Sequence, residues 1–180
     1  MKNKRVLVVL GGTSGERAVS LDSGKACVRA LKKKGYKVST FDPKKKPLNL
    51  IDRNKTDIIF NALHGKDGED GVAQSYFEYL RIPYTHSGIN SSYNAMNKVI
   101  SKKIFKKKKI RSPLYFVLKK EFYNKIELNK IIKKKRMNFP IVIKPINEGS
   151  SIGVKICKNI LELHRASKSL FKKYMELILE

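Results

Sequence analysis

Three glycine-bearing loops in this sequence carry residues that can bind a charged ligand. The first loop reads Gly11-Gly12-Thr13-Ser14-Gly15-Glu16-Arg17. It lacks the spacing of a dinucleotide fingerprint and the Gly-Lys-Ser/Thr ending of a P-loop. The carboxylate of Glu16 would repel phosphate, so the loop suits an ammonium group better. A tight strand–helix turn with Glu16 beside the positive end of the helix dipole remains the alternative.

The second loop reads His64-Gly65-Lys66-Asp67-Gly68-Glu69-Asp70-Gly71. Its acids and glycines suggest a metal loop, but the spacing is not that of an EF-hand. His64 follows an apolar segment, where parallel sheets place ligand contacts, although a lone histidine is more often structural. His86 and His164 show no comparable context.

The third loop, Glu148-Gly149-Ser150-Ser151-Ile152-Gly153, follows Lys144 at the end of an apolar segment. Small residues with free backbone N–H groups can fold over a triphosphate, and the lysine adds a fixed positive charge. An ordinary hairpin with a serine-rich turn is the alternative interpretation.

The elements that position the first two loops alternate between strand and helix patterns. Apolar, β-branched segments predict strands at residues 5–10, 36–41, 57–63 and 82–84, and helical spacing predicts helices between 17 and 34 and at 72–80. This alternation favours an α/β domain with a parallel sheet, which we expect to span residues 1–90.

The pattern changes after residue 88, and we expect a second domain over residues 91–180. The spacing predicts one connector helix over 91–107, further helices at 120–135 and 159–170, and strands at 114–118, 140–145, 154–157 and 175–179. A last strand left unpaired would expose a sheet edge, so we expect this domain to be incomplete.

Composition excludes several classes of protein. The 180 residues include 40 Lys and Arg but only 15 Asp and Glu, giving a net charge of +25, and 41% are hydrophobic. That hydrophobic fraction supports a packed core. The two distant cysteines, Cys27 and Cys157, indicate neither a disulfide framework nor a zinc site. No apolar segment is long enough for a membrane span or a signal peptide, so we expect a cytoplasmic protein.

The charge leaves a nucleic-acid-binding protein open as a rival from a different class. The lysines gather in short runs at expected helix ends, without the arginine forks and interleaved aromatics of base readout. A solvated surface is our preferred interpretation, and titration of duplex DNA with salt separates the two because phosphate binding weakens steeply with salt.

Four ordered motifs together resemble the D-alanine–D-alanine ligases, which are ATP-grasp enzymes of peptidoglycan precursor synthesis: GGTSGERAVSLDSG, ALHGKDGEDGVAQ, PYTHSGINSSYNAMNK and IVIKPINEGSSIGV. The resemblance covers nearly the whole chain. It implies a Rossmann-like pre-ATP-grasp domain followed by the central α+β subdomain of a truncated ATP-grasp fold. It also implies that ATP activates one D-alanine as an acylphosphate, which a second D-alanine attacks, in a reaction that serves cell-wall biogenesis and cell shape.

The resemblance assigns roles to individual residues. Glu16 corresponds to the catalytic acid that holds the first D-alanine's ammonium, and Ser150 to the catalytic serine that orders the site with it. His64 corresponds to the histidine near that substrate's carboxylate. The implied ATP-binding residues are Lys98, Lys144, Glu148, Gly149, Ser150, Ser151 and Glu180, with the lysines on phosphates and Glu180 beginning the adenine segment.

Two departures qualify what the resemblance implies. His86 stands where the family has a glycine, and it would alter the loop if the backbone requires a positive φ. The Asp, Glu and Asn that bind Mg²⁺ or Mn²⁺ have no counterparts here, so we expect no metal ligands and no activity from this chain alone.

The resemblance also sets the expected partners and the nearest rivals. The expected partners are ATP, D-alanine and a second copy in a homodimer, with no membrane. Ligases that join D-alanine to D-lactate or D-serine remain the nearest rivals.

Overall fold

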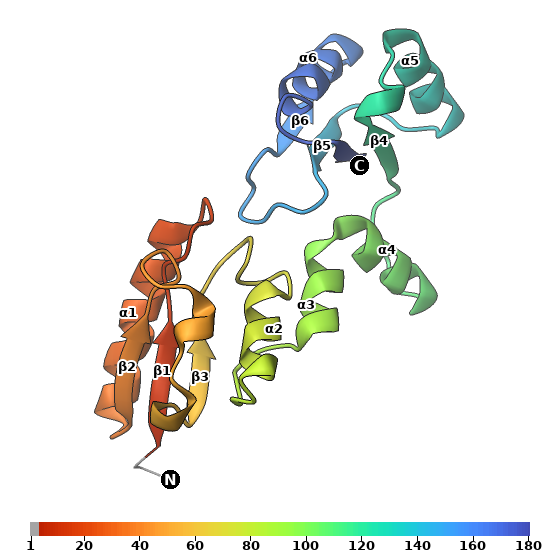
Figure 1. Cartoon of the computed structure of the whole chain (residues 1–180). Helices are drawn as coiled ribbons and strands as arrows, with labels where there is room; N and C mark the ends of the chain where they lie inside the picture. Colours follow the sequence, from red (N-terminus) through yellow and green to blue (C-terminus); the bar gives the residue numbers. More distant parts are fainter. Residues whose placement is uncertain (1–3) are drawn as a thin grey trace. The chain divides into compact units, whose positions relative to one another are not determined.

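The computed structural model describes residues 4–180, with the backbone alone for residues 125–127. The chain divides into two compact units, the first ending at Ala95 and the second beginning at Met96. Figure 1 shows the elements of each unit, which are described separately below.

The first unit is a three-stranded parallel sheet with helices on both faces. Its elements are β1 (Arg5–Val9), α1 (Arg17–Lys33), β2 (Lys37–Phe41), β3 (Ile58–Asn61) and α2 (Val72–Tyr79), and the strand order is β2-β1-β3. Two 3₁₀ turns, Leu48–Leu50 and Arg53–Lys55, lie between β2 and β3. The predicted α/β class is confirmed.

The central strand explains why the first apolar segment of the sequence is continuous. Val6 and Val8 pack in a core cluster with residues of α1, whereas Leu7 and Val9 pack in another with Phe77 of α2. A strand covered on both faces needs apolar side chains on both. Because the strands are parallel, the loops after β1 and β3 leave the sheet at the same edge, the one formed by the carboxyl ends of the strands.

Two predicted elements around residues 82–107 are wrong in detail. The single helix expected over 91–107 is two helices, α3 (Ile89–Met96) and α4 (Lys98–Lys107). Asn97 separates them, because its side chain accepts hydrogen bonds from the backbone N–H groups of Val99 and Ile100, at 3.0 and 3.1 Å, and so caps α4. The strand expected at 82–84 is one parallel bridge between Tyr84 and Ile59.

The second unit is a four-stranded antiparallel sheet with helices. Its elements after α4 are β4 (Phe116–Lys119), α5 (Lys125–Lys134), β5 (Ile141–Pro145), β6 (Lys155–Cys157), α6 (Ile160–Leu170) and β7 (Glu176–Leu179), in the strand order β4-β7-β5-β6. The helix expected over 120–135 is replaced by a 3₁₀ turn at Lys120–Phe122 and the shorter α5. The core packs Ile141 and Ile143 of β5 against Leu163 and Leu170 of α6.

The last strand is paired on both sides, unlike the unpaired strand on which the expectation of an incomplete domain rested. β7 pairs with β4 on one side and with β5 on the other. Leu177, Ile178 and Leu179 are fully buried. Their continuous apolar character is that of an interior strand, which hydrophobic periodicity alone does not place within a sheet.

Within residues 4–180, the structure contains no helix of the length and apolarity that a membrane span requires.

Candidate functional site

The turn after β1 brings Glu16 toward the loop after β3. Ser14 connects the two, because its hydroxyl donates to the His64 carbonyl at 2.7 Å and accepts from the Glu16 backbone N–H at 3.1 Å. Glu16 directly precedes α1, and its side chain is buried. Gly11 and Gly12 both have positive φ, which lets the chain turn sharply between strand and helix.

An ion pair between Arg17 and Asp42 fixes the same turn from outside. The Arg17 guanidinium bonds both Asp42 oxygens, at 2.9 and 2.7 Å, and also the Gly12 carbonyl at 2.7 Å. The Asp42 carboxylate accepts in addition from the Gly12 backbone N–H. The Arg17 hydrogen bonds, in the main, lower the pKa of Asp42 to about 2. A Cβ on Gly11 would lie 2.7 Å from this ion pair, so only glycine fits there.

Hydrogen bonds to its own backbone hold the loop after β3. The Gly68 carbonyl accepts from Asn61 and Gln74, both at 2.9 Å. Asp70 accepts from the Asp67 backbone N–H, so one of the loop's acids serves the loop itself rather than a ligand. This network gives His64 and Glu69 defined positions on a segment that contains no regular secondary structure.

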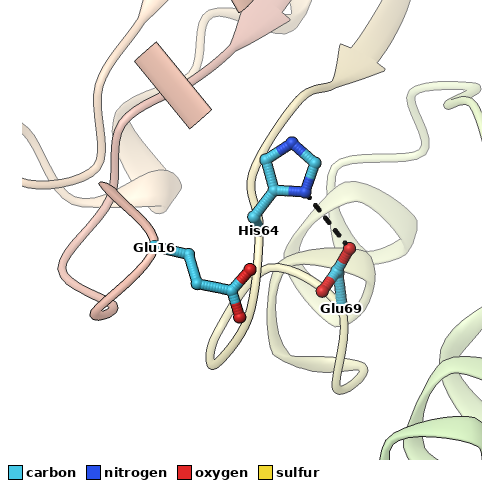
Figure 2. A group of neighbouring side chains, drawn as sticks. All are labelled: Glu16, His64 and Glu69. Carbon is cyan, nitrogen blue, oxygen red and sulfur yellow. Dashed lines mark ion pairs between the residues drawn. The ribbon is translucent and has the colours of Figure 1, made fainter. Parts of the chain in front are cut away.

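Glu16, His64 and Glu69 converge at this sheet edge, as Figure 2 shows. Their ligand-capable atoms lie within 4.8 Å of one another. The His64 Nδ1 atom is 3.4 Å from Glu69 Oε1, and its Nε2 atom is 3.0 Å from the Ser23 hydroxyl of α1. A cavity of about 230 Å³ lies beside the cluster, bounded by Gly11–Ser14, His64 and an apolar wall that includes Leu48 and Leu63.

The second unit gathers lysines around Glu180. Lys144, at the end of β5, contacts Glu180 Oε2 at 2.6 Å, and Lys102 of α4 contacts Glu180 Oε1 at 2.9 Å. Burial works to raise the pKa of the Glu180 carboxyl, but the hydrogen bonds from the two lysines outweigh it and the pKa is lowered. Lys102 is only 7% exposed and also donates to the Pro113 carbonyl at 2.9 Å.

Lys98 belongs to the same lysine cluster. It is the first residue of α4, directly after the Asn97 cap, and its ammonium donates to the Glu148 carbonyl. Burial, and then the nearby charge of Lys144, lower the pKa of Lys98. An incoming anion would offset the repulsion between the two lysines, so the cluster favours binding of a negatively charged group.

The loop between β5 and β6 adopts a backbone that side chains usually avoid. Ser150 and Ser151 have φ of 42° and 60°, in the left-handed region. Gly153 also has positive φ, and a Cβ there would lie 2.9 Å from Pro145. Such conformations concentrate at ligand-binding segments, where the surrounding structure holds them.

The structure therefore assembles the sequence-predicted residues into two groups. Glu16 and His64 lie together in the first unit, and Lys98, Lys144, Glu148 and Glu180 lie together in the second. Gly149, Ser150 and Ser151 follow Glu148 in the loop. The grouping of Ser150 with Glu16 joins residues of different units and stays a prediction.

Sequence reasoning missed several residues of these sites. Helical spacing could have identified Lys102, because it lies four residues after Lys98 and therefore on the same face of a helix. Glu69 was one of three acids in its loop, and nothing in the sequence distinguished it from the others. The Arg17–Asp42 pair joins residues 25 positions apart, and sequence alone did not connect them.

His86 has the positive φ that the sequence analysis raised as a possibility, at 78°. Its ring stands edge-on to Phe60, with centroids 5.9 Å apart, and its Nδ1 atom lies 2.8 Å from the Thr85 hydroxyl. These contacts hold a histidine in a conformation that glycine adopts more readily.

Comparison with known proteins connects these features to one family. The family model for the D-ala D-ala ligase N-terminus matches residues 39–87, and that for the C-terminus matches residues 104–180. A D-alanine–D-alanine ligase of Pelagibacter ubique is 47% identical over 181 aligned positions, which cover 98% of this chain and 57% of that protein. The chain thus spans little more than half the length of this relative.

Solved structures agree with the sequence matches. A crystal structure of a D-alanine–D-alanine ligase from Bacillus anthracis is 37% identical and superimposes with a TM-score of 0.84, covering 98% of this chain and 57% of that one. The ATP complex from the same organism gives a TM-score of 0.79 at 34% identity, covering 98% and 58%. These neighbours have the ATP-grasp fold, and the chain belongs to the D-alanine–D-alanine ligase family.

Proposed function

We propose that the protein of which these residues are part joins two D-alanines in an ATP-dependent reaction that passes through an acylphosphate. The observation that carries the proposal is that a chain of this family contains one cluster of carboxylates and one cluster of lysines. One unit offers carboxylates at a sheet edge, and the other offers lysines beside a glycine loop. A zwitterionic amino acid and a nucleotide phosphate have the complementary charges.

Each group has a role in the proposed reaction. The Glu16 carboxylate binds the ammonium of the first D-alanine, and His64 lies near the carboxylate of that substrate. Lys98 and Lys144 bind ATP phosphates, where fixed positive charge stabilises the charge that develops during transfer. Residues 149–151, including Ser150, close over the nucleotide and exclude water from the acylphosphate.

Glu180 accepts a hydrogen bond from the adenine amino group in this proposal. Its carboxylate is held by Lys102 even when Lys144 turns to phosphate, because the two lysines contact different oxygens. Magnesium or manganese would neutralise phosphate charge and orient the transferred group. The carboxylates beside these lysines do not offer a site for it: both Glu180 oxygens contact lysines, and Glu148 is paired with Lys173 at 3.4 Å. We therefore place the metal ligands in residues beyond this chain.

The test is a chain extended with the remaining residues of the Pelagibacter relative. We expect ATP- and D-alanine-dependent release of phosphate and formation of dipeptide, with D-lactate and D-serine as poorer second substrates. A polypeptide of the 180 residues alone should release no phosphate, because it lacks the metal ligands. An extended chain that folds and binds ATP but forms no dipeptide would contradict the proposal.

The cellular setting follows from the proposed reaction rather than from the fold. The dipeptide is a precursor of peptidoglycan, so the enzyme would serve cell-wall biogenesis from the cytoplasm, where ATP is available. A homodimer is part of the proposal, and sedimentation of the extended chain tests it.

A further inference from the structure

Three side chains of the first unit face one another at the sheet edge: one imidazole and two carboxylates, from His64, Glu16 and Glu69 (Figure 2). We propose that this cluster binds one divalent transition cation of the zinc type. The cluster lies in the first unit, whereas the lysines proposed to bind ATP lie in the second. The proposed site also revises our expectation from sequence that the chain holds no metal ligand.

The contact of His64 Nε2 with Ser23 determines which ring nitrogen can bind the cation. The Ser23 hydroxyl lies 2.9 Å from the Val19 carbonyl and 3.0 Å from His64 Nε2, so in the tautomer with the proton on Nε2 it donates to the carbonyl and accepts from the ring. With the proton on Nε2, the Nδ1 atom presents a lone pair toward Glu69. Two acceptors then face each other at 3.4 Å, and a cation between them satisfies both.

The carboxylates are also held in place by groups outside the cluster. Glu69 Oε2 accepts from the Gly65 backbone N–H at 2.8 Å, which leaves Oε1 directed at the imidazole. Glu16 is 7% exposed, and a Cβ on Gly65 would lie 2.9 Å from its Oε1, so glycine at 65 leaves room for that oxygen. Outer hydrogen bonds of this kind fix the orientation of metal ligands and raise affinity.

The ligand set selects the class of cation. Zinc binds nitrogen and carboxylate oxygen at about 2.0–2.2 Å in tetrahedral sites, where neighbouring ligands lie about 3.4 Å apart. The separation of His64 Nδ1 and Glu69 Oε1 equals that spacing, and a carboxylate oxygen of Glu16 lies within 4.8 Å of both, so Glu16 is the third ligand once its side chain moves closer. Magnesium prefers oxygen ligands alone and retains water, so it should not compete.

A cation at this position would exclude an amino-acid ammonium from the same carboxylate. Zinc should therefore inhibit the extended enzyme in competition with the first D-alanine. This consequence rests on the proposed function, whereas metal binding itself does not.

The experiment titrates the purified 180-residue chain with Zn²⁺ by calorimetry and with Co²⁺ by visible absorption. We expect one equivalent to bind, with tetrahedral Co²⁺ bands, and an excess of Mg²⁺ to leave binding unchanged. Glu69→Gln and His64→Gln should each weaken binding by at least about tenfold. The matched controls Glu78→Gln and His86→Gln, on other parts of the same unit, should bind as the parent does.

Two results would overturn the proposal. One is the absence of Zn²⁺ binding by a chain whose circular dichroism shows it to be folded, which an imidazolium paired with Glu69 would explain. The other is binding that survives both cluster variants. If Zn²⁺ binds at the cluster but does not compete with D-alanine in the extended enzyme, the metal site stands and the ammonium role of Glu16 is wrong.

Discussion

The first unit gathers one imidazole and two carboxylates around one point, which we call the acceptor cluster, whereas the second gathers lysines around one carboxylate. In the first unit, Ser14, Ser23 and the Gly65 backbone hold the acceptors from outside. In the second, Lys144 and Lys102 share the carboxylate of Glu180, and Lys98 donates to a carbonyl.

The difference concerns what each site needs when a ligand arrives. In the cluster of Glu16, His64 and Glu69, a cation would replace the direct contact between His64 and Glu69 and would bind both side chains. If Lys144 binds phosphate as proposed, it has to leave Glu180, so the lysine cluster exchanges a partner. Under the proposed function, Lys102 would keep Glu180 in place during that exchange, through its own contact with the other carboxylate oxygen.

The largest effect is expected from replacing Lys144, the lysine that is proposed to move from Glu180 to phosphate. Lys144→Met in the extended enzyme should lower turnover by about 10²–10³-fold, because one fixed charge on the transferred phosphate is lost. Turnover measured with saturating ATP and D-alanine checks this. The free energy of unfolding without nucleotide should fall by less than in Lys102→Met, since Lys144 is the more exposed of the two lysines that pair with Glu180. Unchanged kinetics would reduce Lys144 to a surface lysine at the base of a hairpin.

A change in the acceptor cluster should weaken binding of D-alanine rather than binding of ATP. Glu16→Gln replaces a charge-assisted hydrogen bond to an ammonium, worth about 1.5–3 kcal/mol, and should raise the KM for the first D-alanine by about 10–100-fold. The KM for ATP should stay within about twofold. An equal rise in both constants would mean that Glu16 supports the loop and does not bind the substrate.

Replacement of the buried Lys102 should lower the stability of the fold. Lys102→Met leaves one oxygen of the half-buried Glu180 carboxylate without its cation, and we expect the free energy of unfolding to fall by about 1–3 kcal/mol. Denaturant titration measures this. Lys103→Met, at the exposed neighbouring position of α4, is the matched control and should have no effect. Equal stability of the two variants would mean that the ion pair between Lys102 and Glu180 does not stabilise the fold.

The smallest effect concerns the ion pair that supports the acceptor cluster. The pKa of Asp42 is lowered from 3.8 to about 2. A lowered folded-state pKa stabilises the fold above pH 4, and this contribution is lost as the pH falls toward 2. Asp42→Asn should therefore lower the free energy of unfolding by about 1 kcal/mol at pH 7, and the difference should vanish as the pH falls below the folded-state pKa of about 2. A difference that does not depend on pH would point to packing instead.

Local patterns in the sequence determined much of the architecture. The continuous apolar segment before Gly11 predicted the buried strand β1, and alternating elements predicted the parallel sheet. Four ordered motifs identified the family, and they included Glu16, His64, Lys98 and Lys144. These features depend on residues close together in the chain, where backbone conformation and side-chain periodicity act.

The tertiary structure decided how distant residues combine. Only the fold places Lys102 against Glu180, 78 positions later in the chain, and Ser23 against His64, 41 positions later. It also places β7 inside its sheet and selects Glu69 from the three acids of its loop. The physical reason is that strand order and hydrogen-bond partners depend on which segments meet in the folded core, and hydrophobic patterning constrains which face of a strand is buried but not which strand lies beside it.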